Sequence, residues 1–129
     1  MKPGVRRSWL LGAAALYVTS LWLPAIEGSG FPAQTGLDVL RQGAGAFRDG
    51  VVAWYANPLL WLALVLGWIG ARRPALACAV LGCLLALSSF TAGFAAESAG
   101  RSVPAFSFGA GFYVWLGAFA LALIGLFRD

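Results

Sequence analysis

The sequence predicts an all-α fold: an integral membrane bundle of four transmembrane helices with a short amphipathic helix in the first outer loop. Of the 129 residues, 60% are hydrophobic and 11% are charged, a balance that ordinary water-soluble domains do not have. The apolar residues fall into four segments of bilayer-spanning length. Short basic pairs flank these segments, as expected of residues that orient membrane helices. We therefore expect a single transmembrane domain over residues 1–129.

The four predicted spans cover residues 8–26, 51–70, 74–96 and 105–127, with outer loops at 27–50 and 97–104. About twenty helical residues cover the roughly 30 Å of a hydrocarbon core. The first span follows a basic head and lacks a good cleavage site after Leu23, so we expect it to remain uncleaved. Arg72-Arg73-Pro74 makes so short a turn that the second and third spans must be antiparallel neighbours.

The first outer loop contains the start signal of a short helix. Thr35 and Asp38 have the spacing of a capping box, and Leu37 and Leu40 begin an apolar face that Ala44 and Phe47 continue. Such a helix would lie on the membrane surface or over the mouth of the bundle.

Aromatic residues recur at helical spacing in the second and last spans. Trp54, Trp61 and Trp68 are seven residues apart and so share one helix face, with Trp61 near mid-depth. In the last span Phe119 continues a second aromatic face. Such stripes usually face lipid or fill a core. The alternative is an aromatic cavity lined by Trp54, Trp61, Phe108, Phe112 and Trp115.

One face of the third span carries only small residues, spaced by three and four positions. Small residues let membrane helices approach closely and gain van der Waals contact. We therefore expect this stripe to be a packing seam against a neighbouring helix; its members are Ala75, Ala79, Gly82, Ala86, Ser89, Gly93 and Ala96.

A polar amide lies near the outer end of the second span. Pro58 lacks the backbone N–H that would bond to the Trp54 carbonyl, and Asn57 stands beside this free acceptor. If the helices pack in chain order, an outer-mouth polar cluster would comprise Glu27, Asn57, Glu97 and Arg101. The alternative is a set of loop charges that face water.

Charge placement predicts the orientation. Basic residues favour the cytoplasmic side. With the amino terminus inside, three basic residues lie outside, namely Arg41, Arg48 and Arg101. Six then lie in the cytoplasm, namely Lys2, Arg6, Arg7, Arg72, Arg73 and Arg128. We therefore expect a multi-pass protein of a bacterial-type inner (plasma) membrane with both termini cytoplasmic.

The inventory of reactive groups favours a non-catalytic protein. The chain has no histidine, no ionisable residue lies clearly within a span, and no catalytic or nucleotide-binding motif is found. Cys78 and Cys83 lie about 140° apart on a helix, so we expect neither a metal site nor a disulfide. No cofactor and no nucleic acid are expected.

Two functions fit this inventory. The first, which we favour, is an accessory or assembly subunit whose small and aromatic faces pack against the helices of a partner membrane protein. The alternative is a homo-oligomeric channel or carrier for a neutral or lipophilic solute. The expected partners are the lipid bilayer and either another membrane protein or further copies of this chain.

Overall fold

The computed structural model describes residues 3–28, 31–42, 53–91 and 107–128, most of which are helical. The α-helices are α1 (Pro3–Trp22), α2 (Gly36–Gln42), α3 (Ala56–Trp68), α4 (Arg72–Leu87) and α6 (Ala110–Phe127). A 3-10 turn, η2 (Ala53–Tyr55), leads into α3, and another, η3 (Ser88–Thr91), extends α4. Three short strands complete the fold: β1 (Pro24–Gly28), β2 (Phe31–Thr35) and β3 (Ser107–Phe108).

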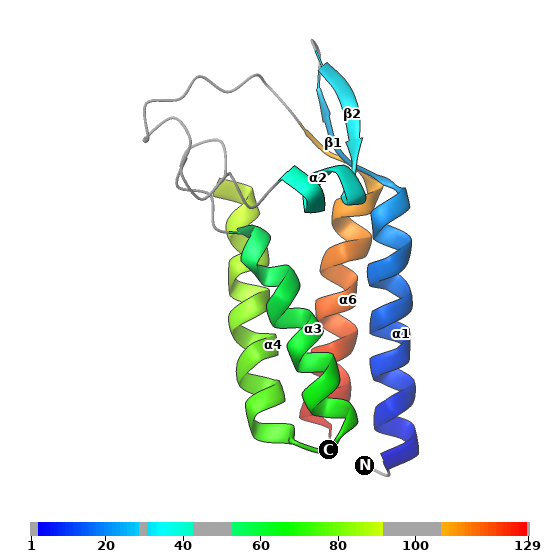
Figure 1. Cartoon of the computed structure of the whole chain (residues 1–129), viewed down its shortest axis with the longest axis vertical. Helices are drawn as coiled ribbons and strands as arrows, with labels where there is room; N and C mark the ends of the chain where they lie inside the picture. The colour runs from blue at the N-terminus through cyan, green and yellow to red at the C-terminus, as the bar shows by residue number, and fades with distance from the viewer. Residues whose placement is uncertain (1–2, 29–30, 43–52, 92–106, 129) are drawn as a thin grey trace.

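The four long helices lie side by side and alternate in direction (Figure 1). Helix α1 packs mainly against α6, α3 packs against α4, and α4 also packs against α6, while α1 and α3 make a smaller contact. The helices therefore follow one another around the bundle in chain order. One end, here called the sheet end, carries the strands and α2 (Figure 1). The other, here called the basic end, carries the start of α1, the α3–α4 turn and the end of α6.

Two stretches are long and apolar enough to cross a membrane, namely Arg72–Phe90 and Ala110–Phe127. Only 28% and 39% of the residues in these stretches are buried inside the protein, and the others are partly or fully exposed. Helix α3 is apolar but has 13 residues, and α1 has 20 residues that include Arg6 and Arg7. By length and composition, two of the helices could thus cross a membrane, and the four spans stay a prediction.

The sheet end corrects the all-α expectation. The first helix ends at Trp22, not residue 26, and Pro24 opens a three-stranded antiparallel sheet of order β2-β1-β3. A proline inside a helix would remove a hydrogen bond and clash with the preceding turn, whereas the first residue of a strand tolerates it. Because β3 pairs with β1, opposing Phe108 to Ile26, the last helix starts at Ala110 and not at residue 105.

The remaining helix boundaries follow from local chemistry. Pro58 lies in the first turn of α3, where a missing N–H costs little. The second predicted span becomes η2 followed by α3, and α3 ends at Trp68, just before Gly70 with its φ of +92°. The third span is helical from Arg72, two residues earlier than predicted, to Thr91, and its last predicted residues lie outside the described part.

The predicted capping box of the loop helix is present. The Thr35 backbone N–H donates to Asp38 Oδ2 at 3.1 Å, and the Asp38 N–H donates to Thr35 Oγ1 at 3.3 Å. Helix α2 lies across the sheet end of the bundle (Figure 1). Ala44 and Phe47 fall outside the described residues.

The small stripe of α4 is buried as predicted. Ala75, Ala79 and Ala86 have no exposed surface, and Ser89 is 7% exposed. A Cβ placed on Gly82 would lie 3.2 Å from Leu59 Cβ of α3 and 3.0 Å from Phe119 Cε1 of α6. The stripe therefore forms the seam between α4 and its two neighbours, while Gly93 and Ala96 lie outside the described residues.

We predict that Gly82→Leu destabilises the bundle by about 1–3 kcal/mol, because a large side chain would have to displace Leu59 and Phe119. Unfolding of the full chain in mild detergent, followed by circular dichroism, measures the loss. Leu84→Ile is the control, since Leu84 is 60% exposed on the outer face of the same helix. Equal stability of the two variants would show that the seam does not hold α4 in place.

Candidate functional site

The polar centre of the bundle is Asn57, in the first turn of α3 and 7% exposed. Its Nδ2 donates to the Trp54 carbonyl at 2.8 Å, the contact expected from the missing N–H of Pro58. Its Oδ1 accepts a hydrogen bond at 2.9 Å from Trp115 Nε1 of α6. One amide thus satisfies a partly buried acceptor and a partly buried donor and joins two helices.

Trp54 extends this connection to the loop helix. Its indole Nε1 donates to the Leu40 carbonyl at 2.7 Å, near the carboxyl end of α2. Leu40, Trp54, Asn57 and Trp115 therefore form a continuous chain from α2 through η2 and α3 to α6. This chain holds α2 over the sheet end of the bundle.

The aromatic residues of β3 and the start of α6 pack against one another. Phe108 and Phe112 stack with ring centroids 3.9 Å apart, and Phe112 lies 5.8 Å from Trp115. Phe90, from η3, meets both phenylalanines edge-on at 5.5 and 5.3 Å. The sequence analysis did not single out Phe90, because it lies apart from the aromatic repeat of the last span.

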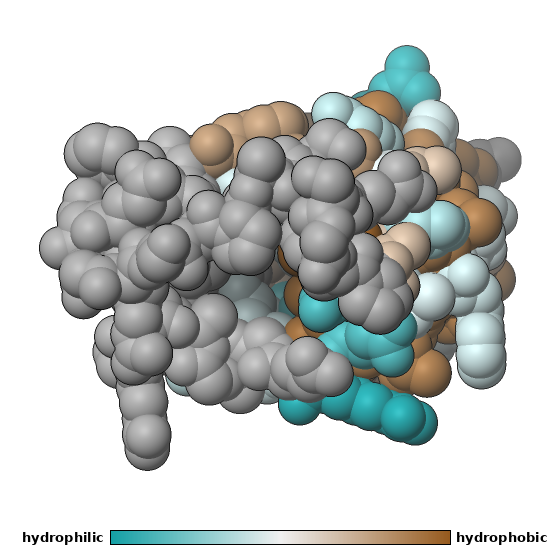
Figure 2. Space-filling model, turned by 90° about the horizontal axis from the view of Figure 1, so that it is seen from above, coloured by the Kyte–Doolittle hydropathy of each residue, from teal (hydrophilic) through white to brown (hydrophobic). Residues whose placement is uncertain are grey.

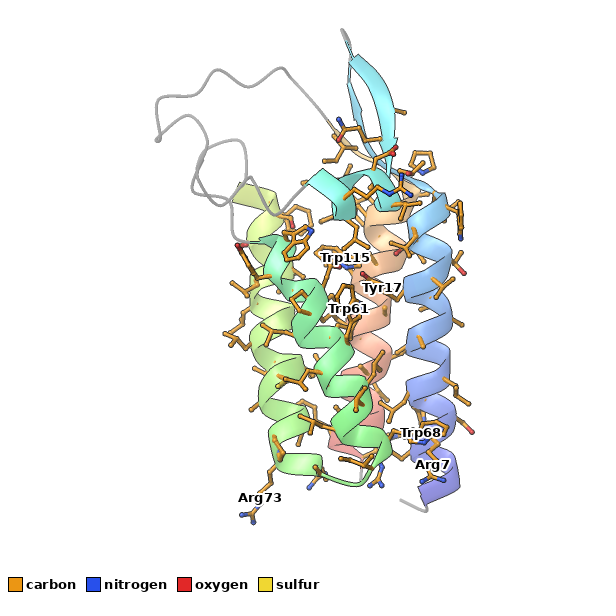
Figure 3. All side chains as sticks on the ribbon, in the orientation of Figure 1. Arg7, Tyr17, Trp61, Trp68, Arg73 and Trp115 are labelled. Atoms are coloured by element: carbon orange, nitrogen blue, oxygen red, sulfur yellow. The ribbon has the colours of Figure 1, made fainter. Side chains whose placement is uncertain are left out.

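Trp61 lies apart from these rings. It contacts Tyr17 of α1 edge-on, with centroids 6.0 Å apart, and is 41% exposed. Figure 3 shows Tyr17, Trp61 and Trp115 in the half of the bundle nearer the sheet. The structure thus brings Phe108, Phe112 and Trp115 together and links Trp54 to them through Asn57. It places Trp61 against the first helix instead.

Tyr17 is a core residue that sequence reasoning missed. Its ring is 7% exposed, and its hydroxyl makes no hydrogen bond within the described part of the protein. Leu10, Ala13, Tyr17 and Ser20 recur at three and four positions and are all buried. That repeat was the sequence signal that could have identified Tyr17 as a core residue.

Of the predicted outer-mouth cluster, only the side chain of Asn57 is described. The backbone of Glu27 lies in β1 and pairs with Ser107. The side chain of Glu27, and Glu97 and Arg101 as a whole, fall outside the described part. Within the described residues, no group of three or more His, Cys, Asp or Glu side chains is placed to hold a metal ion. Cys78 and Cys83 are both free thiols.

The basic end carries arginines placed at helix carboxyl termini. Arg72 donates from Nε to the Leu126 carbonyl at 2.8 Å and from Nη2 to the Phe127 carbonyl at 3.3 Å. Arg7 lies over the Trp68 ring, 4.8 Å from its centroid, and reaches the Trp68 carbonyl at 3.5 Å. Both cations thereby complement the negative ends of helix dipoles. Arg73 points away from the bundle (Figure 3).

No protein family, curated protein or solved structure matches this chain. The geometry of the described residues is therefore the basis for assigning a function. It contains a structural amide network near the sheet end and a cationic surface at the opposite end.

We predict that Asn57→Leu costs about 1–2 kcal/mol, because it leaves the Trp54 carbonyl and the Trp115 indole without partners. A double-mutant cycle with Trp115→Phe measures the coupling free energy between the two side chains. Interhelical polar contacts in membranes average about 0.6 kcal/mol and reach about 1.7, so we expect a coupling within that range. Strictly additive effects of the two substitutions would contradict the bond.

Proposed function

We propose that this protein is a four-span integral membrane protein that serves as a non-catalytic accessory or assembly subunit and packs against the helices of a partner membrane protein. The observation that carries the proposal is the outer surface of the bundle. Large apolar side chains are exposed on all four long helices, for example Leu11, Val65, Leu84 and Ile124. Apolar patches of this extent are typical of surfaces that contact lipid or protein.

The apolar surface supports four spans even though only two helices meet the requirements of length and composition together. Helix α3 packs against α4 and α1 packs against α6. The four helices lie side by side (Figure 1), so we expect them to share the same depth. Backbone groups in strands and loops need polar partners, and the strands lie together at one end, where hydrophilic residues also gather (Figure 2). The bundle between the two ends is the part suited to the bilayer.

Charge supports the orientation. Five described arginines lie at the basic end, namely Arg6, Arg7, Arg72, Arg73 and Arg128, whereas Arg41 and Asp38 lie in α2 at the sheet end. Basic residues favour the cytoplasmic face. The proposed topology therefore places the basic end, with the start of α1 and the end of α6, in the cytoplasm of a bacterial-type cell.

The packed interior favours the accessory role over the channel or carrier role. Leu60 and Phe119 are fully buried at the centre of the described bundle, together with Ala13, Ala56 and Ala118. A solute path along the bundle axis would have to displace these side chains. A transporter of this fold would instead have to place its path between copies.

We predict that a reporter that fluoresces only in the cytoplasm is bright when fused after Asp129 and dark when inserted at Gly30. The protein should also stay in the membrane fraction after alkaline carbonate extraction. A bright Gly30 fusion would invert the orientation, and release by carbonate would contradict the spans themselves.

We further predict that chemical cross-linking in cells, followed by isolation in mild detergent, captures the protein together with a partner membrane protein. Alone, it should run as a monomer in size-exclusion chromatography with light scattering. A homogeneous homo-oligomer that conducts a neutral solute into proteoliposomes would instead support the channel or carrier.

A further inference from the structure

We infer that an open groove between α1 and α6 at the basic end binds one acyl chain of an anionic phospholipid, with the lipid phosphate at Arg128. This inference rests on the proposed membrane insertion, which places the groove in the cytoplasmic leaflet. It adds a specific lipid site to a general bilayer environment.

The groove is lined by Val5, Ser8, Trp9 and Gly12 of α1 and by Leu121 of α6. Val5, Ser8, Trp9 and Gly12 recur at three, one and three positions, so they form one face of α1. The missing side chain of Gly12 deepens this face, because a Cβ there would lie 3.4 Å from Leu121 Cδ1. Apart from the Ser8 hydroxyl, which donates to the Gly4 carbonyl, the lining is apolar and suits a hydrocarbon chain.

The register of α1 against α6 places Arg128 at the end of this groove. A Cβ on Gly117 would lie 3.4 Å from Leu16, and one on Gly125 would lie 2.5 Å from Trp9. Together with the pair of Gly12 and Leu121, these contacts describe one constant antiparallel register. Continued by one turn, that register sets Arg128 opposite Val5. Arg128 is exposed and follows Leu121 by seven residues, so the two share a face of α6.

The basic end supplies the charge that an anionic headgroup requires. The sequence places six basic residues there against one acidic residue, Asp129, and five of the six are described. Arginine matches phosphate through several N–H donors in one plane. Basic surfaces on the cytoplasmic side attract anionic lipids. A soluble phosphate would use the charge alone, whereas a phospholipid also fills the apolar groove.

Lipid binding to the full chain in mild detergent, followed by native mass spectrometry, tests the site. The probes are dioleoyl phosphatidylglycerol, dioleoyl phosphatidylcholine and the chain-free headgroup glycerophosphoglycerol. We expect phosphatidylglycerol to bind at least about five-fold more tightly than phosphatidylcholine, since the two lipids have the same chains and differ in charge. We expect the chain-free headgroup to bind far more weakly than either lipid.

Two variants remove the two halves of the site. Gly12→Leu fills the groove and should weaken the binding of both lipids by about five-fold or more. A Cβ at this position would lie 3.4 Å from Leu121 Cδ1, which leaves room for the first carbon of the new side chain. Arg128→Gln removes the cation and should abolish the preference for phosphatidylglycerol. Arg73→Gln is the matched control, because Arg73 is an exposed arginine of the same end on another helix. Circular dichroism verifies that each variant is folded.

Three results with the two lipids and the variants would overturn the site, and a fourth concerns the chain-free headgroup. They are equal binding of the two lipids, unchanged binding by folded Gly12→Leu, and an equal effect of Arg73→Gln and Arg128→Gln, which would indicate a diffuse surface charge. Tight binding of the chain-free headgroup would indicate an anion site without an acyl groove and would overturn it too. A protein that resists carbonate extraction but fails these tests refutes the lipid site and leaves the proposed membrane topology intact.

Discussion

The close approach of the α1 and α6 backbones is the constraint on which the rest of the structure depends. A Cβ on Gly111 would lie 2.6 Å from the Leu23 carbonyl oxygen, and one on Gly125 would lie 2.5 Å from Trp9 Cβ, so no other residue fits at either end of this seam. Between them Ala13, Ala118 and Ala122 are fully buried. In lipid, helices gain little from hiding apolar surface, and close van der Waals contact is the main attraction. The contact at Gly111 also brings the start of α6 beside Pro24, which allows Gly109 N–H to donate to the Ala25 carbonyl at 2.9 Å and β3 to pair with β1.

Two described side chains, Asn57 and Arg72, satisfy polar groups of the bundle with hydrogen bonds from within the protein. Asn57 donates a hydrogen bond to the Trp54 carbonyl, which Pro58 leaves without a backbone donor, and accepts one from the indole N–H of Trp115. Arg72 donates hydrogen bonds to the last carbonyls of α6. An unpaired polar group in an apolar medium costs several kcal/mol, so these contacts fix where α3, α4 and α6 meet. The Tyr17 hydroxyl is one exception within the described part of the bundle.

Features that depend on local periodicity were predictable from the sequence, and features that depend on distant pairing were not. The small stripe of α4, the capping box of α2 and the Asn57 contact with Trp54 all arise within a few residues of one another. The sheet requires Ile26 to meet Phe108, which is 82 residues away by subtraction, and no local pattern encodes that contact. The shared face of Trp61 and Trp68 was predictable from their spacing. Its neighbour was not, because the choice between α1 and α6 depends on packing of the whole bundle.

The placement of small residues also separates the two surfaces for which we propose partners. Most of the described alanines and glycines lie in the seams between helices. The outward face of α4 therefore carries larger side chains, namely Leu81, Leu84 and Leu87. A partner helix at that face must supply its own small residues to approach closely. The groove at Gly12 already presents the small residue that close approach of a helix needs, but it opens beside Arg128 at the basic end. A partner helix with its own cytoplasmic basic residues would be repelled there, whereas an anionic lipid would be attracted. An anionic lipid at Gly12 and a partner helix at another face of the bundle are therefore compatible.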